Sequence, residues 1–419
     1  MTKASANESK KQPSIRERAL SLLGNEDFFG ELRKALKCGG LVGEVRNALA
    51  IYIVAISSLL DHPLSVLIKG PSSGGKNFLA TRVLDLLPKT AIREISSSSK
   101  TAWNYGANDF RHKVVYLQER NDASGAVHPV RLLISEQKIV RTVTVRKGNE
   151  FISKEFVANG PIASISTTTK NRIEVDDETR HLSVWIDESP AQTLQILKRR
   201  NSTAANLGKE KEELEVWHEA YRLLERRASV PVDLPDWFVR IIDLVFVDDV
   251  RVRRYFPAFQ EAIRTIALIR SFQTHPEDYE PDDSISARFS DYATATCIFE
   301  DLFVESLHLA DDDCMATLKA VKEIAATAKD GAAGANQLAT KLKISPDMAY
   351  ARLRAASEAG AIVRANEPEK NNIKRYRPAE RPRFVPSPKE VFEKVRPTSK
   401  PTIQFTDPVT GELVKFARK

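Results

Sequence analysis

The sequence predicts an α/β protein that has a parallel sheet, a helical lid and a small helical unit near its C-terminal end. Three observations lead to this prediction. A glycine-rich loop stands between an apolar strand and an amphipathic helix at residues 66–87. Strand and helix patterns alternate as far as residue 190, which favours a parallel sheet. From residue 191 to residue 309 the pattern is almost wholly helical.

Composition limits the class of protein. The 419 residues are enough for two or three domains, and the formal net charge of +7 is a mild excess that favours an anionic partner, nucleic acid first. Cys38, Cys297 and Cys314 are odd in number and far apart, so they indicate neither a zinc site nor a disulfide framework and suit a reducing cytosol. The N-terminus lacks the apolar stretch of a signal peptide, and the longest apolar run, residues 49–60, is too short to span a bilayer. We therefore expect a cytoplasmic protein without membrane contact.

The N-terminal part of the chain leads into the sheet. Residues 1–13 are expected to be disordered, and amphipathic spacing predicts helices between residues 14 and 40. The apolar run at residues 49–60 is interpreted as a buried helix. The β-rich stretch PLSVLIKG then enters the glycine loop. The predicted boundaries are 1–40 for the N-terminal disordered and helical segment, 41–190 for the α/β core and 191–312 for the helical lid.

Further strands follow within the core. HKVVYLQE at residues 112–119 carries hydrophobic side chains and ends in an acid. IVRTVTVRKGNEFISKEFVANG alternates on both sides of residues 146–149, which predicts a hairpin. PIASISTTTK and HLSVWIDES are interpreted as two more core strands.

A second unit is predicted at residues 313–378. The helical patterns GANQLATKLK and MAYARLRAASEAG are joined by the turn ISPD, where Ser345 is the expected N-cap and Pro346 the first helical residue. AIVRANEPEKNNIKRYRP then indicates two short strands around a polar loop. A helix–turn–helix followed by a hairpin is the winged-helix pattern. The tail at residues 379–419 is proline-rich and basic and is expected to be extended.

The glycine loop supplies phosphate-binding chemistry, because successive backbone N–H groups and a helix N-terminus can wrap phosphates. The loop fits G-x-x-x-x-G-K-[ST] at every position but the last, where Asn77 replaces the hydroxyl residue that normally ligates Mg²⁺. Lys76 would reach the β- and γ-phosphates. A coincidental turn is the alternative. The expected nucleotide-binding residues of the loop are Gly70, Pro71, Ser72, Ser73, Gly74, Gly75, Lys76, Asn77 and Phe78.

Polar residues at two strand ends would complete a hydrolytic site. Glu119 is the candidate acid that activates water, and a surface glutamate at a strand end is the alternative. The preceding position, where an Asp would help to hold the metal, is Gln118. SISTTTKN offers several groups that could hold the attacking water or serve as turn residues: Thr167, Thr168, Thr169 and Asn171.

Several segments in one order resemble the AAA+ ATPases of the minichromosome maintenance (MCM) helicase type. They are the stretch Leu41-Val-Gly-Glu44, SVLIKGPSSGGKN, ISEQKIV, the hairpin, NGPIASISTTTKNRIEVDDETRHLSVWIDESPAQT and VRVRRYFPAFQEAIRTIALI. The most similar group looks like the helicase-like ATPases of bacterial phages, plasmids and integrated elements, which often end in a winged helix. The resemblance covers roughly residues 40–378. It implies an α/β P-loop AAA+ parallel sheet with a helical lid, plus a C-terminal winged helix-turn-helix domain.

The resemblance also implies roles for residues around the nucleotide. Glu119 would be the catalytic acid, and Thr168 or Thr169 would be the sensor 1 residue. Arg180 stands where an arginine finger reaches a neighbouring subunit's nucleotide, and a local ion pair is the alternative, with Asp176, Asp177 or Glu178. The sensor 2 position falls on one of three arginines, Arg251, Arg253 or Arg254, of which Arg254 is the candidate that binds the nucleotide.

DNA-binding residues are expected in two places. The hairpin tip, with Arg146 and Lys147, stands where MCM-type enzymes insert a hairpin into the DNA channel, and an ordinary solvent turn is the alternative. In the second unit the second helix would lie in the major groove. Its candidate contacts are Tyr350, Arg352 and Arg354, if Ala349, Leu353 and Ala356 form the core face; Lys374 and Arg375 of the basic wing would bind phosphates. A protein-binding winged helix is the alternative.

The resemblance implies a hexameric, ATP-driven DNA translocase or helicase that acts in the replication of a mobile element, with ATP and Mg²⁺ as cofactors. Asn77 and Gln118 are both amides at metal-organising positions, so we expect nucleotide binding to survive and Mg²⁺ affinity and turnover to be reduced. Two other interpretations stay open. One is a nucleotide-gated DNA-binding regulator or loader with weak or no hydrolysis, and the other is an inactive scaffold. The two amides favour these, whereas the hairpin and Arg180 favour the translocase.

Overall fold

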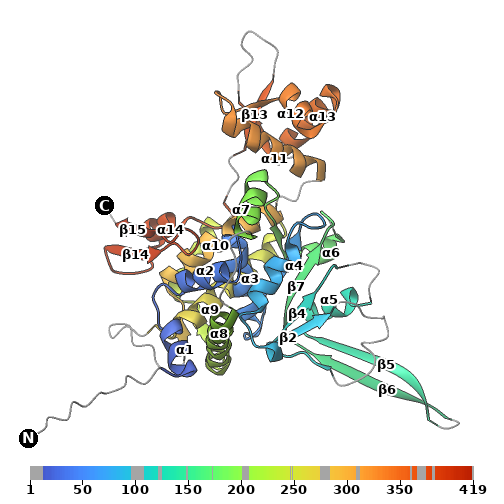
Figure 1. Ribbon diagram of the computed structural model, residues 1–419, viewed down its shortest axis with the longest axis vertical. Coiled ribbons are helices and arrows are strands. Elements are labelled where there is room, and N and C mark those ends of the chain that lie inside the picture. The colour runs from blue at the N-terminus through green and yellow to red at the C-terminus, as the bar shows by residue number, and fades with distance from the viewer. Residues whose placement is uncertain are drawn as a thin grey trace, which may run out of the picture.

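The structure of the protein, a computed structural model, is centred on one five-stranded parallel sheet (Figure 1). The strands lie in the order β2-β4-β7-β1-β8, and their bounds are β1 (Ser65–Lys69), β2 (Ile92–Ile95), β4 (Lys113–Leu117), β7 (Ile162–Thr168) and β8 (Leu182–Trp185). This confirms the predicted mixed α/β class with a parallel sheet. The described residues are 13–95, 108–120, 125–147, 150–171, 173–200, 207–245, 247, 249–273, 284–307, 312–358, 361–365, 374–379 and 383–417.

Both faces of the sheet are covered, as parallel strands with continuous apolar sequence require. Successive side chains of a strand point to opposite faces. Val114 and Tyr116 of β4 accordingly join the main core, whereas Val115 and Leu117 pack with α5 (Val127–Glu136) in a smaller cluster. The main core contains α3 (Val45–Ser57), which is buried at every position from residue 48 to residue 57. This confirms the predicted buried helix.

Helices from both ends of the α/β core complete the main core. The N-terminal helices α1 (Ile15–Leu23) and α2 (Phe28–Cys38) pack with the lid rather than apart from it, and Arg18 of α1 pairs with Glu212 and Glu213. The segment predicted as the lid is mainly helical. Its elements are α7 (Pro190–Arg200), α8 (Leu207–Arg227), a 3-10 helix (Asp236–Leu244), α9 (Val252–Arg270), α10 (Phe289–Leu307) and the short parallel pair β9 (Val232–Asp233) and β10 (Ile285–Ser286), whereas α4 (Lys76–Leu84) follows the glycine loop within the α/β core. No helix within the described ranges is both long enough and apolar enough to cross a membrane.

A long two-stranded ribbon leaves the body of the protein before β7 (Figure 1). It consists of β5 (Lys138–Lys147) and β6 (Glu150–Asn159), in antiparallel register from the pair Lys138 and Asn159 to the pair Lys147 and Glu150. The two-residue β3 (Asn108–Asp109) runs parallel to β6. The predicted hairpin is therefore present. Residues 148 and 149 and the side chains of Arg146 and Lys147 lie outside the described part, so the proposed tip contacts stay predictions.

The segment after the lid folds around a core of its own. Its elements are α11 (Asp312–Thr327), β11 (Ala333–Gly334), α12 (Ala335–Leu342), α13 (Pro346–Glu358), β12 (Ile362–Arg364) and β13 (Arg375–Pro378), with an antiparallel sheet in the order β11-β13-β12. The hydroxyl of Ser345 accepts a hydrogen bond from the backbone N–H of Met348 at 3.2 Å, as the predicted N-cap requires. Ala349, Leu353 and Ala356 are fully buried, so the predicted core face of α13 is confirmed.

The prediction of an extended tail is wrong. Residues 383–417 return to the lid and form α14 (Pro388–Glu390), a π-helical turn (Val391–Val395) and a hairpin of β14 (Thr402–Thr406) and β15 (Leu413–Ala417). Pro388 is the first residue of α14 and Pro408 lies in the turn between β14 and β15, while apolar side chains of the same segment enter the main core; these are Phe384, Val385, Val391, Phe392 and Val395. The composition suggested an extended chain because proline and charge outweigh these few apolar residues.

Two side chains of α10 hold the returning segment. The carboxylate of Glu300 accepts hydrogen bonds from the backbone N–H groups of Phe384 at 2.7 Å and Val385 at 3.4 Å. Burial raises the pKa of Glu300 to about 7 despite these bonds. The ring of Phe384 stacks on that of Phe303, with the centroids 4.8 Å apart. The chain therefore returns to the lid after the unit formed by α11 to β13.

Phe384→Ala is expected to destabilise the folded protein by about 3–5 kcal/mol, the usual cost of removing a fully buried aromatic ring. Leu413→Ala is the matched control, because Leu413 lies in the same segment but is 57% exposed. Urea unfolding with a core fluorescence signal would measure both changes. A loss below about 1 kcal/mol in Phe384→Ala would show that the returning segment does not belong to the core.

Candidate nucleotide-binding site

The glycine loop runs from the end of β1 to the start of α4. Gly75, directly before α4, has a φ of +92°, a backbone conformation that glycine adopts without the penalty of a Cβ. Gly70 and Gly74 pack closely against Ile186, because a Cβ on either glycine would lie only 2.4 or 2.3 Å from that side chain. Ile186, directly after β8, therefore packs against the loop, and a side chain on either glycine would displace it.

Lys76 lies inside the loop. Its side chain is buried, and its Nζ donates hydrogen bonds to the carbonyl oxygens of Gly70 at 2.8 Å and Pro71 at 2.6 Å. Burial lowers the pKa of Lys76, although Glu119 and Glu188 oppose this change. The first N–H groups of a helix have no partner within the helix, and they carry a partial positive charge. The loop therefore offers the amides of α4 and one ammonium group, a donor set that fits phosphate.

A hydroxyl on the central strand joins the loop to the candidate acid. Oγ1 of Thr167 donates to Oδ1 of Asn77 at 2.9 Å and accepts from the backbone N–H of Glu119, also at 2.9 Å. Thr167 is fully buried near the end of β7. Residues 77, 119 and 167 thus meet at the carboxyl edge of the sheet, where ligands of parallel α/β sheets bind.

The predicted sensor residues Thr168 and Thr169 do not make this contact. The hydroxyl of Thr168 accepts a hydrogen bond from the backbone N–H of Lys170 at 3.1 Å, within a local turn, and Thr169 is exposed. Thr167, Thr168 and Thr169 are adjacent in sequence, so the hydroxyl that faces α4 depends on how β7 is aligned with its neighbouring strand. In the structure Thr167 pairs with Ile68 of β1, and sequence reasoning could not supply this register.

The two amides predicted to hold Mg²⁺ already have partners. Oδ1 of Asn77 accepts from Thr167, and Nε2 of Gln118 donates to the carboxylate of Glu94 at the end of β2. Among the residues that the structure describes, no group of three or more His, Cys, Asp or Glu side chains is arranged to hold a metal ion. Magnesium keeps several waters and is commonly bound through phosphate oxygens. The residues therefore fit a nucleotide better than they fit a metal ion alone.

Asn77→Ser combined with Gln118→Asp is expected to lower the Mg²⁺ concentration for half-maximal ATP hydrolysis by about tenfold, or about 1.4 kcal/mol. The change restores one hydroxyl and adds a second carboxylate next to Glu94, and a carboxylate at 4–5 Å from a positive charge, here that of Mg²⁺, attracts it by about 3–4 kcal/mol per unit charge at an effective dielectric near 20. Desolvation cancels part of that attraction. The two single variants are the controls, and the double variant should exceed their sum. An ordinary Mg²⁺ requirement in the parent that does not move in the double variant would show that the amides are silent.

Two predicted arginines lie at the opposite edge of the sheet. Arg180, just before β8, donates from Nε to the hydroxyl of Ser135 on α5 at 2.7 Å and from Nη1 to the backbone carbonyl of Asp176. Within the described residues it forms no ion pair with Asp176, Asp177 or Glu178, so the local ion pair considered from the sequence is not what holds it. Arg254 of α9 donates to the hydroxyl of Thr179.

These arginines share a cavity of about 710 Å³ with the amino ends of the strands. Its lining includes Arg180, Arg253 and Arg254. It also includes the first residues of β1, β7 and β8, which are Ser65, Ile162 and Leu182. The glycine loop leaves the other end of β1, four residue steps away, which corresponds to about 13 Å. Arg254 therefore lines a cavity at the end of β1 opposite to the one that the glycine loop leaves. Arg251 instead pairs with Asp249 at 2.5 Å.

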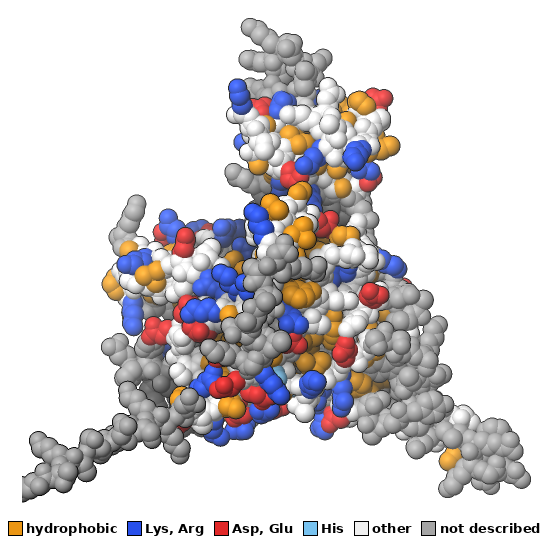
Figure 2. Space-filling view, in the orientation of Figure 1, with side chains coloured by type: hydrophobic (Ala, Val, Ile, Leu, Met, Phe, Trp, Pro, Cys, Tyr) orange, Lys and Arg blue, Asp and Glu red, His pale blue; other side chains and the backbone are white. Residues whose placement is uncertain are grey.

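The candidate DNA-binding residues of the C-terminal unit fall into two groups. Arg352 and Arg375 are mostly covered and form ion pairs with Asp313 at 2.5 Å and Asp330 at 2.8 Å. Tyr350 is 42% exposed and Arg354 is exposed beside Glu358, whereas Lys374 is half-buried and its ammonium lies over the Tyr350 ring at 5.2 Å. Figure 2 shows Lys and Arg side chains, with some carboxylates among them, on this unit at the top of the view.

Phe78 was predicted to belong to the nucleotide site, and it lies in the first turn of α4. Its ring is 46% exposed, and the guanidinium of Arg82 lies over it at 5.3 Å. An exposed ring at the base of the loop has space for a ligand on its uncovered face.

No protein-family model matches this sequence. No curated protein is similar to it in sequence either. Three solved structures match this chain at low identity and with TM-scores below 0.5. A full-length MCM homolog from Methanopyrus kandleri is 14% identical over 72% of this chain, with a TM-score of 0.41, and the match covers 63% of the homolog, less than two thirds of its length. An active helicase, SCCmec type IV Cch, is 13% identical over 83% of this chain and 70% of its own, with a TM-score of 0.34. The C-terminal region of NrS-1 in its apo form is 12% identical over 88% of this chain and 76% of its own, with a TM-score of 0.28.

Proposed function

We propose that the protein is an ATP-hydrolysing DNA translocase or helicase of a mobile genetic element that works as a ring of identical subunits, with six as the expected number. One observation supports this proposal above the others: the chain carries two complementary half-sites on opposite edges of one sheet. The loop with Lys76, Thr167 and Glu119 lies at the carboxyl edge, and Arg180 with Arg254 lies at the amino edge. A neighbouring copy that presents its amino edge to the loop would complete the site.

Each residue then has a task in ATP hydrolysis. Lys76 and the amides of α4 bind the phosphates and neutralise part of their charge. The carboxylate of Glu119 accepts the proton of the attacking water. Thr167 fixes the positions of Asn77 and Glu119 relative to each other. Arg180 of the adjacent copy stabilises the charge on the transferred phosphoryl group, and Arg254 binds the same nucleotide. Bound Mg²⁺ would neutralise further phosphate charge, with Asn77 and Gln118 as its nearest candidate partners.

DNA would contact the protein at two places. We propose that the C-terminal unit is a winged helix, in which α13 follows a turn after α12 and presents Tyr350 and Arg354. Lys374, against Tyr350, would add a phosphate contact. The β5–β6 ribbon, which projects from the body (Figure 1), would make the second contact.

The experiment that tests this function is ATP hydrolysis with and without DNA, titrated with Mg²⁺, beside a measurement of particle mass with and without nucleotide. The proposal predicts that DNA stimulates hydrolysis and that nucleotide promotes a ring. Hydrolysis that ignores DNA, by a particle that stays monomeric at every nucleotide concentration, would contradict it.

Tyr350→Ala combined with Arg354→Ala is expected to weaken binding to duplex DNA by about tenfold or more, because one stacking or apolar contact and one charge are lost. Lys341→Ala is the matched control, since Lys341 is an exposed cation of α12 that pairs with Glu323. Fluorescence anisotropy at fixed salt would measure both affinities. Equal affinities of the double variant and the control would remove α13 from the DNA interface.

A nucleotide-gated DNA-binding regulator or loader is the second candidate. The engaged amides favour it, because Asn77 and Gln118 each have a partner within the protein at the positions where a metal would be organised. This candidate predicts nucleotide-dependent assembly and DNA binding with little hydrolysis even at high Mg²⁺. The same titration therefore separates the two functions.

A further inference from the structure

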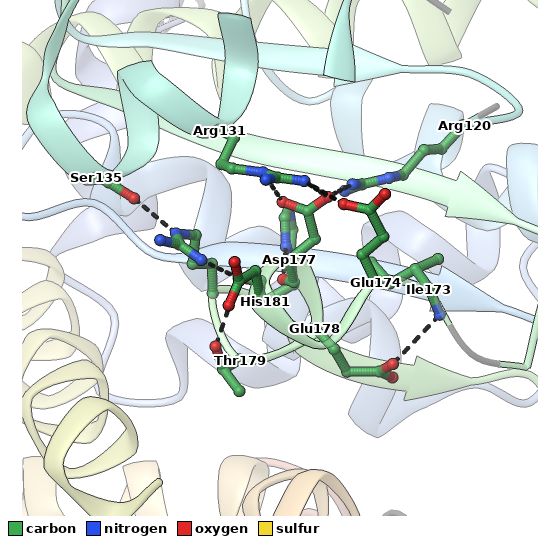
Figure 3. A network of polar contacts seen from close by, with 11 residues as sticks. Arg120, Arg131, Ser135, Ile173, Glu174, Asp177, Glu178, Thr179 and His181 are labelled. Atoms are coloured by element: carbon green, nitrogen blue, oxygen red, sulfur yellow. Dashed lines mark hydrogen bonds and ion pairs between the residues drawn. The ribbon is translucent and has the colours of Figure 1, made fainter. Parts of the chain in front are cut away.

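A buried cluster of charges lies between the two edges of the sheet and has no role in the chemistry described above (Figure 3). Its centre is Asp177, which is 1% exposed and follows the start of the short helix α6 (Val175–Glu178). Arg120, itself buried, forms an ion pair with Asp177. Arg120 directly follows Glu119 in the chain, and its backbone N–H donates to the carbonyl of Thr167 at 2.7 Å. One end of the cluster is thus bound to the nucleotide side of the sheet.

The other end of the cluster reaches Arg180. Arg131 of α5 donates from Nη2 to the carboxylate of Asp177 at 2.7 Å and pairs with Glu174. Ser135, one turn further along α5, accepts from Nε of Arg180, and the backbone N–H of Arg180 donates to the carbonyl of Asp177 at 3.1 Å. Asp177 of α6 is linked to α5 through Arg131, and the guanidinium of Arg180 is held by hydrogen bonds to the same two helices.

The charges of the cluster depend on one another. Burial alone would raise the pKa of Asp177, but the hydrogen bond from Arg131 and the charges of Arg120 and Arg131 hold it below its usual value. Burial also lowers the pKa of His181 to about 4, so its neutral ring donates from Nδ1 to the carbonyl of Asp177 at 2.7 Å. A buried ion pair is costly to separate once one partner moves alone. Arg120 and Asp177 should consequently shift together.

A second buried pair joins the glycine loop to the same helix. Lys69, the last residue of β1 before Gly70, forms an ion pair with Glu178 and donates to the carbonyl of Asn171 at 3.0 Å. Glu178 also accepts from the backbone N–H of Ile173 at 3.3 Å (Figure 3). Both strand ends that would sense the nucleotide, β1 and β4, are therefore bound to α6.

We propose that Asp177 is a positioning residue that couples the nucleotide site of each subunit to the Arg180 which that subunit presents to its neighbour. Binding of the γ-phosphate and water at Glu119 shifts Arg120, and the Arg120–Asp177 pair carries this shift into α6 and Arg180. The inference rests on the proposed function, because it needs an arginine that acts on another copy. Contiguity alone does not demonstrate coupling, so the test must read the direction in which each residue acts.

The test uses mixtures of full-length variants. At each interface one subunit acts as acceptor, with Lys76 and Glu119, and the other acts as donor, with Arg180. Glu119→Gln removes the acid of the acceptor site but keeps the shape of the side chain and the bound nucleotide, so we expect it to be defective as acceptor and to present Arg180 normally as donor. Arg180→Ala is the reverse. Asp177→Asn keeps the shape of the side chain and removes its charge. Asp109→Asn is the matched control, because Asp109 forms an exposed ion pair with Arg111 elsewhere in the core.

Asp177→Asn is expected to keep its affinity for a fluorescent ATP analogue within about threefold and to lose hydrolysis by about tenfold to a hundredfold, the range of ordinary coupling between two sites. Asp109→Asn should change neither. Mixing with Glu119→Gln should restore hydrolysis to Asp177→Asn, whereas mixing with Arg180→Ala should not. The reverse pattern, in which Arg180→Ala gives the rescue, would mean that Asp177 serves its own nucleotide site. Rescue by neither partner would mean that it only holds the fold. Both results overturn the proposal.

Arg120→Met makes the test sharper, because Arg120 adjoins the acceptor residue Glu119 and yet is predicted to behave as a donor residue. Mixing with Glu119→Gln should restore hydrolysis to the Arg120→Met variant. Restoration by Arg180→Ala instead would show that no coupling runs through Arg120. Asp177→Asn combined with Arg120→Met should regain thermal stability lost by Asp177→Asn alone and still behave as a donor defect. The reference mixture is Arg180→Ala with Glu119→Gln. If that mixture fails despite mixed assembly, the proposed function falls and takes this inference with it; if only the Asp177 and Arg120 variants fail, the inference falls alone.

Discussion

Lys76→Ala is expected to abolish ATP hydrolysis and to weaken ATP binding by about three orders of magnitude. One ammonium at about 4 Å from a phosphate charge is worth about 4 kcal/mol at an effective dielectric near 20, and each 1.4 kcal/mol is a factor of ten. The cost to the fold should be small, because the carbonyls of Gly70 and Pro71 that lose a donor lie in a loop beside the phosphate site. Binding of a fluorescent ATP analogue and thermal unfolding would be measured together.

Lys89→Ala is the control for this experiment, since Lys89 is an exposed lysine in a short 3-10 helix after α4. It should leave both binding and stability unchanged. Unchanged ATP affinity in Lys76→Ala would remove the glycine loop from the nucleotide site. A large loss of thermal stability without a loss of affinity would assign Lys76 a structural task instead.

Arg180→Ala is expected to lower the rate of hydrolysis by on the order of 10³, the effect of an arginine finger in NTPases that use one. Affinity for ATP should change little, because the arginine acts on the charge that develops during phosphoryl transfer. Arg111→Ala is the control, as an exposed arginine of the same domain that pairs with Asp109. Single-turnover hydrolysis at saturating ATP would give the rates, and a change of less than about threefold would contradict the assignment.

Local signals in the sequence were enough for the loop, the buried helix, the hairpin and the face of α13. A run of apolar residues predicts α3. The apolar stretch before the glycines predicts β1, and the amphipathic stretch after them predicts α4. Ala349, Leu353 and Ala356 recur with the helical period and are all fully buried. In each of these cases, the residues that determine the structure are neighbours along the chain.

Contacts between distant residues were the part that the sequence did not supply. Thr167 is the threonine that meets Asn77 and Glu119, because the register of β7 against β1 turns its hydroxyl toward α4. The Arg120–Asp177 pair joins residues 57 positions apart, and no local pattern links them. The fold of residues 383–417 depends on Glu300 and Phe303 of α10, whose sequence says nothing about the segment that they hold.

The position of Arg254 illustrates the same limit for the site. From the sequence it was a candidate nucleotide-binding residue, with no indication of which nucleotide it would meet. Its hydrogen bond to Thr179 places it beside Arg180, at the amino ends of the strands. The geometry therefore places both arginines in the lining of one cavity, and the proposed function gives them the nucleotide of another copy of the chain.

The central claim is that the loop of one copy and Arg180 of another make one site, and subunit mixing tests it most directly. Arg180→Ala and Glu119→Gln should each be nearly inactive alone, since each removes one half of every site. Mixed in equal amounts, with mixed assembly verified by mass, they should recover hydrolysis at the interfaces where a sound Arg180 meets a sound Glu119. Recovery at an intermediate mixing ratio is the result predicted here. No recovery at any ratio, despite mixed assembly, would contradict a site shared between copies.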